Sequence, residues 1–173
     1  MKIKVLKKSK INNSLKIEIC KLKKTFWNYT LKSHKEWFEN NIKKDDIHIL
    51  LFNEKKLIGY NLLRKRNYYL VFNKNIKKNF YYFDTLIIKK EFRKNNLSKK
   101  ILNRSLSLSR KNNLPLILIC KKKNINFYEK FTFKLLKKNN FKFMDHKFTS
   151  FSMIYAKKIT KYLISNKIHL YLN

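Results

Sequence analysis

The segment from Phe80 to Leu102 most constrains the fold, because its hydrophobic period changes halfway along. Its first part, FYYFDTLII over residues 80–88, is aromatic and β-branched with one acid, Asp84, in the middle. A strand with one solvated face would alternate polar and apolar residues, so this pattern predicts a strand covered on both faces. From Leu97 onward, leucine and isoleucine recur at roughly helical spacing with basic residues between them. The chain therefore predicts a buried strand followed by an amphipathic helix.

The turn between this strand and this helix has the basic sequence RKNNLS over residues 93–98. The first N–H groups of a helix lack intrahelical acceptors, and the helix dipole adds partial positive charge at that end. A helix N-terminus directly behind a strand therefore favours an anion such as phosphate. We predict a phosphate-binding site at this turn.

The remaining sequence predicts alternating helices and strands in one domain. Gly59 lies inside an expected strand, where it marks a bulge or a close approach. Trp27 and Trp37 are expected to pack in the core, with a substrate-lining role as the alternative. The tail over residues 157–173 fits either a helix or an extra strand. The other expected elements are strands at 3–6, 47–52, 57–64, within 67–79, and at 116–120, 141–144 and 148–155, and helices at 31–42, at 125–133 and after a cap at Ser14.

The net charge is extreme, with 43 Lys and Arg against 10 Asp and Glu giving +33. Such a charge suggests a polyanionic partner such as nucleic acid. A second explanation is coding bias, because residues with A/T-rich codons are abundant while Gly and Pro each occur once. The basic residues are spread over the whole chain, which favours coding bias over a dedicated binding patch.

Cysteine and histidine usage gives no sign of a disulfide or a metal site. Cys20 and Cys120 are far apart in sequence, and the four histidines lack ligand spacing. No apolar run is long enough to span a bilayer, and the first ten residues lack the apolar core of a signal peptide. These features predict a cytoplasmic protein with no membrane span, while the oligomeric state stays open.

Two motifs resemble those of the GNAT superfamily of acetyl-CoA-dependent N-acetyltransferases. The family's strand is followed by R/Q-x-x-G-x-G/A at a helix start, and Arg93, Asn96 and Ser98 occupy those places here. The sequence YEKFTF over residues 128–133 resembles the family's Y-E-K-x-G-F. The resemblance implies an α+β fold with a central mixed, mostly antiparallel sheet of roughly six to seven strands and about four flanking helices. It covers a GNAT-like acetyltransferase domain at residues 1–156, with 157–173 as a C-terminal extension of uncertain structure.

The chain departs from the family pattern at several positions. Asn96 and Ser98 replace both glycines of the phosphate loop, Thr132 replaces the glycine of the second motif, and Lys121 replaces a frequent Asn. Asn tolerates a left-handed backbone better than other non-glycine residues, and such a conformation costs about 1–2 kcal/mol. The coding bias against glycine explains these changes with function intact. Decay to an inactive acyl-CoA-binding protein is the other explanation.

The resemblance implies that a primary amine attacks the thioester of acetyl-CoA directly, with no metal. Tyr128 would protonate the leaving thiolate, or else it is one of ten tyrosines that only pack. Asp84 would accept a proton from the amine through water or anchor the amine, or else it only fixes a loop. The implied cofactor-binding residues lie in the strand end, the turn and the second motif: Leu86, Ile87, Ile88, Arg93, Lys94, Asn95, Asn96, Leu97, Ser98, Lys99 and Tyr128.

The acceptor expected from the charge is a small-molecule amine on a neutral or anionic carrier, such as an amino sugar, or an acidic macromolecule. A field of +33 repels polycations and attracts anions. The alternative from another class is a basic nucleic-acid-binding domain with aromatic side chains stacked on bases. Four consecutive aromatic residues at 80–83 would face both sides of a sheet, which argues against a one-sided stacking surface.

Overall fold

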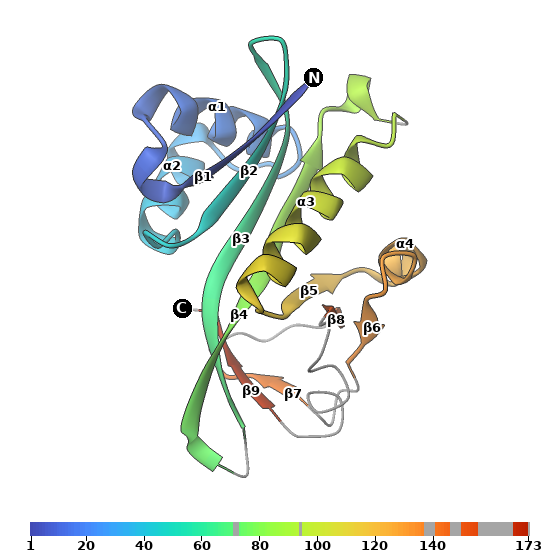
Figure 1. Ribbon diagram of the computed structural model, residues 1–173. Coiled ribbons are helices and arrows are strands. Elements are labelled where there is room, and N and C mark those ends of the chain that lie inside the picture. Colours follow the sequence, from blue (N-terminus) through green and yellow to red (C-terminus); the bar gives the residue numbers. More distant parts are fainter. Residues whose placement is uncertain (71–72, 94, 137–140, 146–149, 156–167, 173) are drawn as a thin grey trace. The chain divides into compact units, whose positions relative to one another are not determined.

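The computed structural model describes residues 1–70, 73–93, 95–136, 141–145, 150–155 and 168–172. The chain forms two compact units. The first unit comprises residues 1–64 and 84–107, and the second comprises residues 65–83 and 108–173. Two long strands, β3 (Lys56–Leu70) and β4 (Asn73–Ile88), and helix α3 (Leu97–Asn112) contribute to both units (Figure 1).

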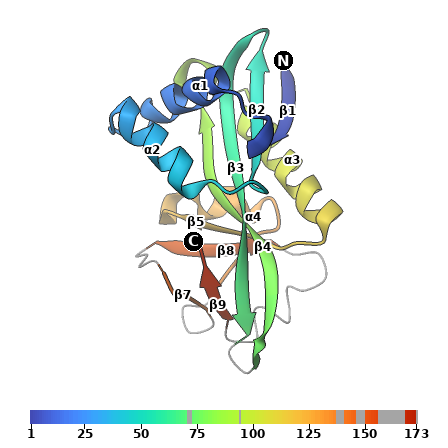
Figure 2. The ribbon, with the colours of Figure 1, turned by 90° about the vertical axis from the view of Figure 1, so that its left-hand side faces the viewer.

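The first unit is a sheet with helices on both faces. Its strands β1 (Lys2–Lys7) and β2 (Ile47–Asn53) are antiparallel, and β2 pairs with β3 in the same sense. Helices α1 (Asn13–Lys24) and α2 (Leu31–Asn41) cover one face, while α3 packs on the other (Figures 1 and 2). Two 3₁₀ turns complete the unit, η1 (Lys8–Lys10) and η2 (Lys90–Phe92).

Helices α1 and α2 begin at side-chain caps. The Asn12 side chain accepts a hydrogen bond from the Leu15 N–H at 2.9 Å, so the cap of α1 is Asn12 and not Ser14 as predicted from sequence. Both residues favour caps, and the sequence did not distinguish them. The Thr30 hydroxyl accepts a hydrogen bond from the Ser33 N–H, so Thr30 is the cap of α2. Thr30 ends the α1–α2 loop, which is rich in aromatic residues.

Gly59 marks both a bulge and a close approach, as the sequence predicted. The register of β2 with β3 shifts next to Gly59, because Leu51 faces Gly59 while Phe52 faces Leu57. A Cβ at Gly59 would lie 2.8 Å from the Cδ1 atom of Ile88 and 3.0 Å from that of Ile101. The missing side chain therefore lets α3 pack closely on the sheet.

The second unit is built around strand β5 (Leu116–Cys120), which the sequence predicted correctly. It pairs parallel to β4 over Tyr81–Phe83 and antiparallel to β8 (Phe151–Tyr155). The other elements are η3 (Lys122–Asn124), α4 (Ile125–Glu129), β6 (Lys134–Leu135), β7 (Phe141–Phe143) and β9 (Ile168–Tyr171).

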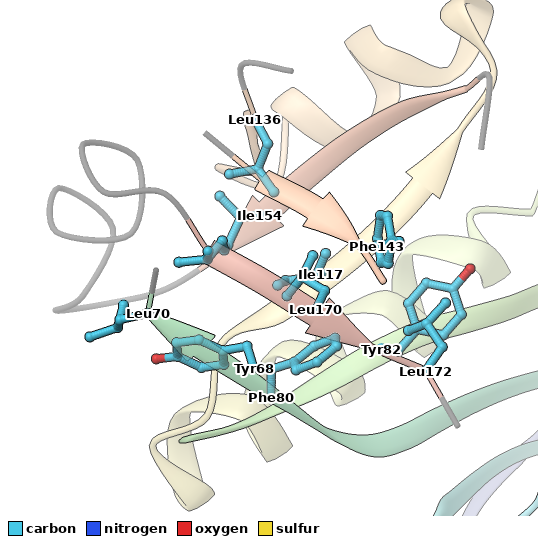
Figure 3. Packing of buried hydrophobic residues seen from close by; sticks show 11 residues of the cluster. Tyr68, Leu70, Phe80, Tyr82, Ile117, Leu136, Phe143, Ile154, Leu170 and Leu172 are labelled. Atoms are coloured by element: carbon cyan, nitrogen blue, oxygen red, sulfur yellow. The ribbon is translucent and has the colours of Figure 1, made fainter. Parts of the chain in front are cut away.

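Aromatic and aliphatic side chains from six strands, with Leu136 and Leu172 just after two strand ends, form the core of the second unit (Figure 3). Tyr68 and Phe80 meet edge to face, with ring centres 6.3 Å apart. All four aromatic residues of the 80–83 run are buried, so they are core residues rather than a stacking surface. The sequence-based argument against base stacking on this run is therefore confirmed.

The α+β class and the mixed, mostly antiparallel sheet are confirmed, but the described residues contain nine strands. The strands beyond the predicted range of roughly six to seven are short ones that are hard to recognise in the sequence, such as β6 and β9. Within the tail, the described residues 168–171 form a strand that pairs with β3 and β7. Helix α4 ends at Glu129, earlier than expected, and no helix in the described part of the chain is long and apolar enough to cross a membrane.

Candidate active site

The junction between β4 and α3 has the left-handed turn that its glycine-free sequence left in question. Asn96 has a φ of 55°, and its carbonyl accepts the N–H of Lys100 at 3.2 Å, which opens the helix. Asn95, Asn96 and Lys99 are exposed around this opening, and Ser98 is half-buried. Unpaired N–H groups, the helix dipole and a nearby lysine suit this end of α3 to an anion.

Three other residues predicted to bind the cofactor, Arg93, Ile87 and Leu97, have side chains that contact the protein itself. The Arg93 Nε donates to the Ile88 carbonyl at 3.2 Å, and its guanidinium lies 4.8 Å from the centre of the Phe26 ring. Ile87 and Leu97 are buried, so only their backbone groups are left for a ligand. Lys94 lies outside the described residues.

Strand β4 changes its hydrogen-bonding edge between Tyr81 and Lys89. The Tyr81 N–H donates to the carbonyl just before β5, whereas the Lys89 N–H donates to Ile58 of β3. In a regular strand these two positions would face the same edge, so we infer an irregularity between them. One residue before Lys89, the N–H of Ile88 points away from β3, on an edge where the described pairs with β5 stop at Phe83.

A cavity of about 390 Å³ lies in the first unit, between α1, the α1–α2 loop, α2 and β4. Its volume lies within the range of small-molecule sites, which is about 300–1,000 Å³. Its lining combines aromatic, basic, hydroxyl and acidic side chains: Lys23, Trp27, Tyr29, Ser33, His34, Trp37, Asp84 and Thr85. Trp37 packs against the core as predicted and also lines this cavity, whereas Trp27 is exposed at the cavity and not packed in the core. A substrate-lining role for the two tryptophans stays a prediction.

Asp84 is held at the wall of this cavity by two donors. The Nη1 atom of Arg64 donates to its Oδ2 at 3.2 Å, and the Thr85 hydroxyl donates to its Oδ1 at 3.3 Å. The Arg64 side chain is almost fully buried, while 17% of the Asp84 side chain is exposed. The carboxylate is therefore fixed in orientation and still reached from the cavity.

Lys23 is a buried cation beside Asp84 that sequence reasoning missed. Its Nζ lies 3.5 Å from the centre of the Trp37 ring and 5.8 Å from that of Trp27, and only 7% of the residue is exposed. Burial lowers its pKa to about 8, against the attraction of Asp84. A lysine on an amphipathic helix is usually solvated, so the sequence carried no signal for it.

His34 is the buried residue that α2 contributes to the lining of the cavity. Its Nε2 lies 3.3 Å from the Trp27 carbonyl, and its ring meets that of Tyr29 edge to face. Burial lowers the pKa of His34, which favours the neutral ring. These contacts tie α2 to the α1–α2 loop and hold the Tyr29 ring at the cavity.

Tyr128 lies in the second unit, in the short helix α4. Its ring packs edge to face on Phe83 and Phe127, with centres 6.2 Å and 5.1 Å away. Burial raises the pKa of Tyr128 to about 12, so the phenol stays protonated at neutral pH. A protonated phenol can donate a hydrogen bond to the charge that develops on a departing sulfur, although complete transfer of its proton is uphill, because a thiol ionises at about pH 8.5.

The motif around Tyr128 also retains its left-handed position without glycine. Thr132 has a φ of 63°, and the next N–H, of Phe133, donates back to the Tyr128 carbonyl at 3.3 Å. A left-handed residue after a helix is the usual way to end it. The two motif positions at which this chain replaces glycine by Asn96 and Thr132 thus keep a left-handed conformation.

Comparison with known proteins agrees with this arrangement. The sequence matches the acetyltransferase (GNAT) family over residues 17–133. No curated protein sequence matches the chain.

Solved structures show the same fold at low sequence identity. The GNAT family N-acetyltransferase YhbS from Escherichia coli, in complex with CoA, has a TM-score of 0.68 at 11% identity, covering 98% of this chain and 88% of that one. ElaA from Escherichia coli has a TM-score of 0.65 at 14% identity, covering 88% and 97%. An aminoglycoside 6′-N-acetyltransferase complexed with coenzyme A has a TM-score of 0.62 at 14% identity, covering 89% and 96%.

Strand β4 thus leads through a left-handed turn into α3, with a cavity beside the strand. The chain belongs to the acetyltransferase (GNAT) family. This membership makes it an acyltransferase.

Proposed function

We propose that the chain transfers an acetyl group from acetyl-CoA to a primary amine that binds in the cavity beside Asp84. The observation that carries this proposal is that Asp84 lines the cavity on the same strand that leads to the left-handed turn at Asn96. One strand thus joins a candidate acceptor site to a candidate phosphate site.

The proposed cofactor contacts use backbone more than side chains. The pyrophosphate would lie at the start of α3, against the N–H groups of residues 97–99 and the Lys99 side chain. The N–H groups of Leu86 and Ile88 would bind the cofactor and stabilise the oxyanion that forms from the thioester carbonyl. The orientation of the Ile88 N–H away from β3 supports this role.

In the proposed reaction the amine nitrogen bonds to the thioester carbon and the carbon–sulfur bond breaks. The departing sulfur accepts a hydrogen bond and then a proton from Tyr128. Because the pKa of Tyr128 is about 12 and that of a thiol is about 8.5, this transfer is uphill, and solvent water returns a proton to the phenolate. The proton lost by the amine passes through water to Asp84. The hydrogen bond from Arg64 keeps the carboxylate oriented for this role.

The charges around the cavity support an acceptor on a neutral or anionic carrier. Asp84 is the one acid in the described lining, and it is already paired with Arg64 and lies beside Lys23. A polycation would meet this local excess of positive charge as well as the net charge of +33. That positive charge would repel a polycation, but it would attract an amino sugar linked to a nucleotide or an acidic macromolecule.

Competition between acceptors tests this function. The protein is mixed with acetyl-CoA and either a nucleotide-linked amino sugar or spermidine at low salt, and release of the CoA thiol is followed. We expect faster release with the amino sugar, and the difference should shrink as salt rises because exposed charges are screened. Faster acetylation of spermidine would contradict the proposed acceptor class, and the absence of thiol release with every amine tested would indicate a decayed enzyme.

A further inference from the structure

Asp84, the one acid in the described lining of the cavity, interacts with two buried cations, Lys23 of the same lining and Arg64. Asp84 accepts a hydrogen bond from Arg64 at 3.2 Å, and it also attracts the ammonium of Lys23. Lys23 itself has no carboxylate within ion-pair distance in the described part of the chain. Two groups therefore stabilise its charge: Asp84, by Coulombic attraction, and the face of Trp37, whose centre lies 3.5 Å from Nζ.

An aromatic wall of this kind would ordinarily attract a cationic ligand. Here the protein's own cations use the Trp37 ring, with Lys23 on it and the Arg64 guanidinium 5.7 Å from its centre. An ammonium acceptor would add a third positive charge to this cluster. An anionic group would instead gain a charge-assisted hydrogen bond from Lys23 in a place with little competing water.

We propose that Lys23 determines acceptor specificity by binding a carboxylate or phosphate group that lies close to the acceptor's amine. Trp27 and Tyr29, which are partly exposed at the cavity, contact the apolar part of the same molecule. The substrate class is thus an amine with a neighbouring anionic group. This inference rests on the proposed function, because it takes the cavity as the acceptor site.

Intrinsic fluorescence offers a direct measure of binding at this cavity. The chain contains two tryptophans, and both Trp27 and Trp37 line the cavity. Three matched probes differ in one group: 2-phenylethylamine, phenylalanine, and the phosphonate analogue of phenylalanine. Each is titrated at pH 7 with excitation selective for tryptophan, and Trp27→Phe assigns the signal to Trp37.

We expect the two anionic probes to bind about 10- to 100-fold more tightly than 2-phenylethylamine, the range for one hydrogen bond to a charged group. Comparison of the carboxylate with the phosphonate identifies the preferred anion. Lys23→Met should abolish the preference, and Lys23→Arg should keep most of it. Lys24→Met is the matched control, because Lys24 is the exposed neighbour on the same helix, and its preference should equal that of the wild type.

Three results would overturn the role of Lys23. These are equal or tighter binding of 2-phenylethylamine by the wild type, a preference that survives in Lys23→Met, and no fluorescence response to any probe. CoA thiol release is measured separately with the same amines. A Lys23-dependent binding preference without thiol release would contradict the proposed transfer reaction while supporting the anion-binding role.

Discussion

Arg64 donates a hydrogen bond to Asp84 over 3.2 Å, between side chains from two neighbouring strands of the first unit. Arg64 is almost fully buried, so removing Asp84 would leave a buried positive charge with a weaker set of partners. The pair therefore links the stability of the strand to the orientation of the proposed base. A variant that keeps the shape of the carboxylate separates these two effects.

Asp84→Asn is such a variant. It retains the hydrogen-bonding oxygen for Arg64 but cannot accept the proton of the amine. We expect kcat/KM for the acceptor to fall by about 10²-fold or more, the usual contribution of a general base, with acetyl-CoA affinity unchanged. Asp45→Asn, at an exposed acid that pairs with Lys7, is the control and should leave kcat/KM unchanged. Unchanged turnover in Asp84→Asn would limit Asp84 to a structural role.

Tyr128→Phe removes the proposed acid with little change of shape. Its ring packing should survive, while turnover should drop by about 10²–10⁴-fold. Because the pKa of Tyr128 is about 12, wild-type turnover should show no loss from its ionisation up to pH 10. Steady-state kinetics on Tyr128→Phe and on Tyr69→Phe, a half-buried tyrosine outside both motifs, test the assignment. Equal activity of the two variants would mean that Tyr128 only packs.

The two left-handed positions should respond differently to substitution. Thr132, with a φ of 63°, is β-branched and strained, so Thr132→Gly should raise the free energy of unfolding by up to about 1 kcal/mol after the entropy cost of glycine. Asn96→Ala should lower it by about 1 kcal/mol, since alanine tolerates this region less well than asparagine. Urea titrations measure both changes. A loss of stability in Thr132→Gly would contradict the inferred strain.

The buried His48 should make the protein less stable in mild acid. Burial lowers the pKa of His48 to about 3, and its Nδ1 lies 2.9 Å from the Tyr60 hydroxyl. The unfolded chain binds this proton below about pH 6.5 while the folded chain does not, so stability is lost as pH falls from 6.5 toward 3.

The expected slope is at most about 1.4 kcal/mol per pH unit from this one residue. His34, whose pKa is also lowered, acts in the same direction, so variants rather than the wild type alone must be compared. His48→Asn should flatten the dependence of the unfolding free energy between pH 6.5 and 5, whereas His169→Gln in the second unit should not. Parallel slopes for wild type and His48→Asn would contradict the prediction.

Local patterns in the sequence predicted the strand and helix that carry the candidate site. The pairing of strands that are distant in sequence could not be predicted from such patterns. The change of hydrophobic period after Phe80 identified β4 and α3, and the tolerance of asparagine for a left-handed backbone anticipated the turn at Asn96. The pairing of β9 with the far end of β3 joins residues about a hundred positions apart, and no local pattern encodes it. Lys23 was missed for the same reason, because its burial depends on Trp37 from another helix.

Acetyl-CoA binding at the start of α3 is tested most directly by calorimetric titration of two charge-reversal variants on that helix. Lys99 lies in the first turn of α3 and Lys111 in the last, and both are exposed. We expect Lys99→Glu to weaken acetyl-CoA binding by about tenfold or more, a loss of about 1.4 kcal/mol, while Lys111→Glu leaves the affinity close to that of the wild type. Equal affinities for the two variants would contradict a pyrophosphate site at this helix N-terminus.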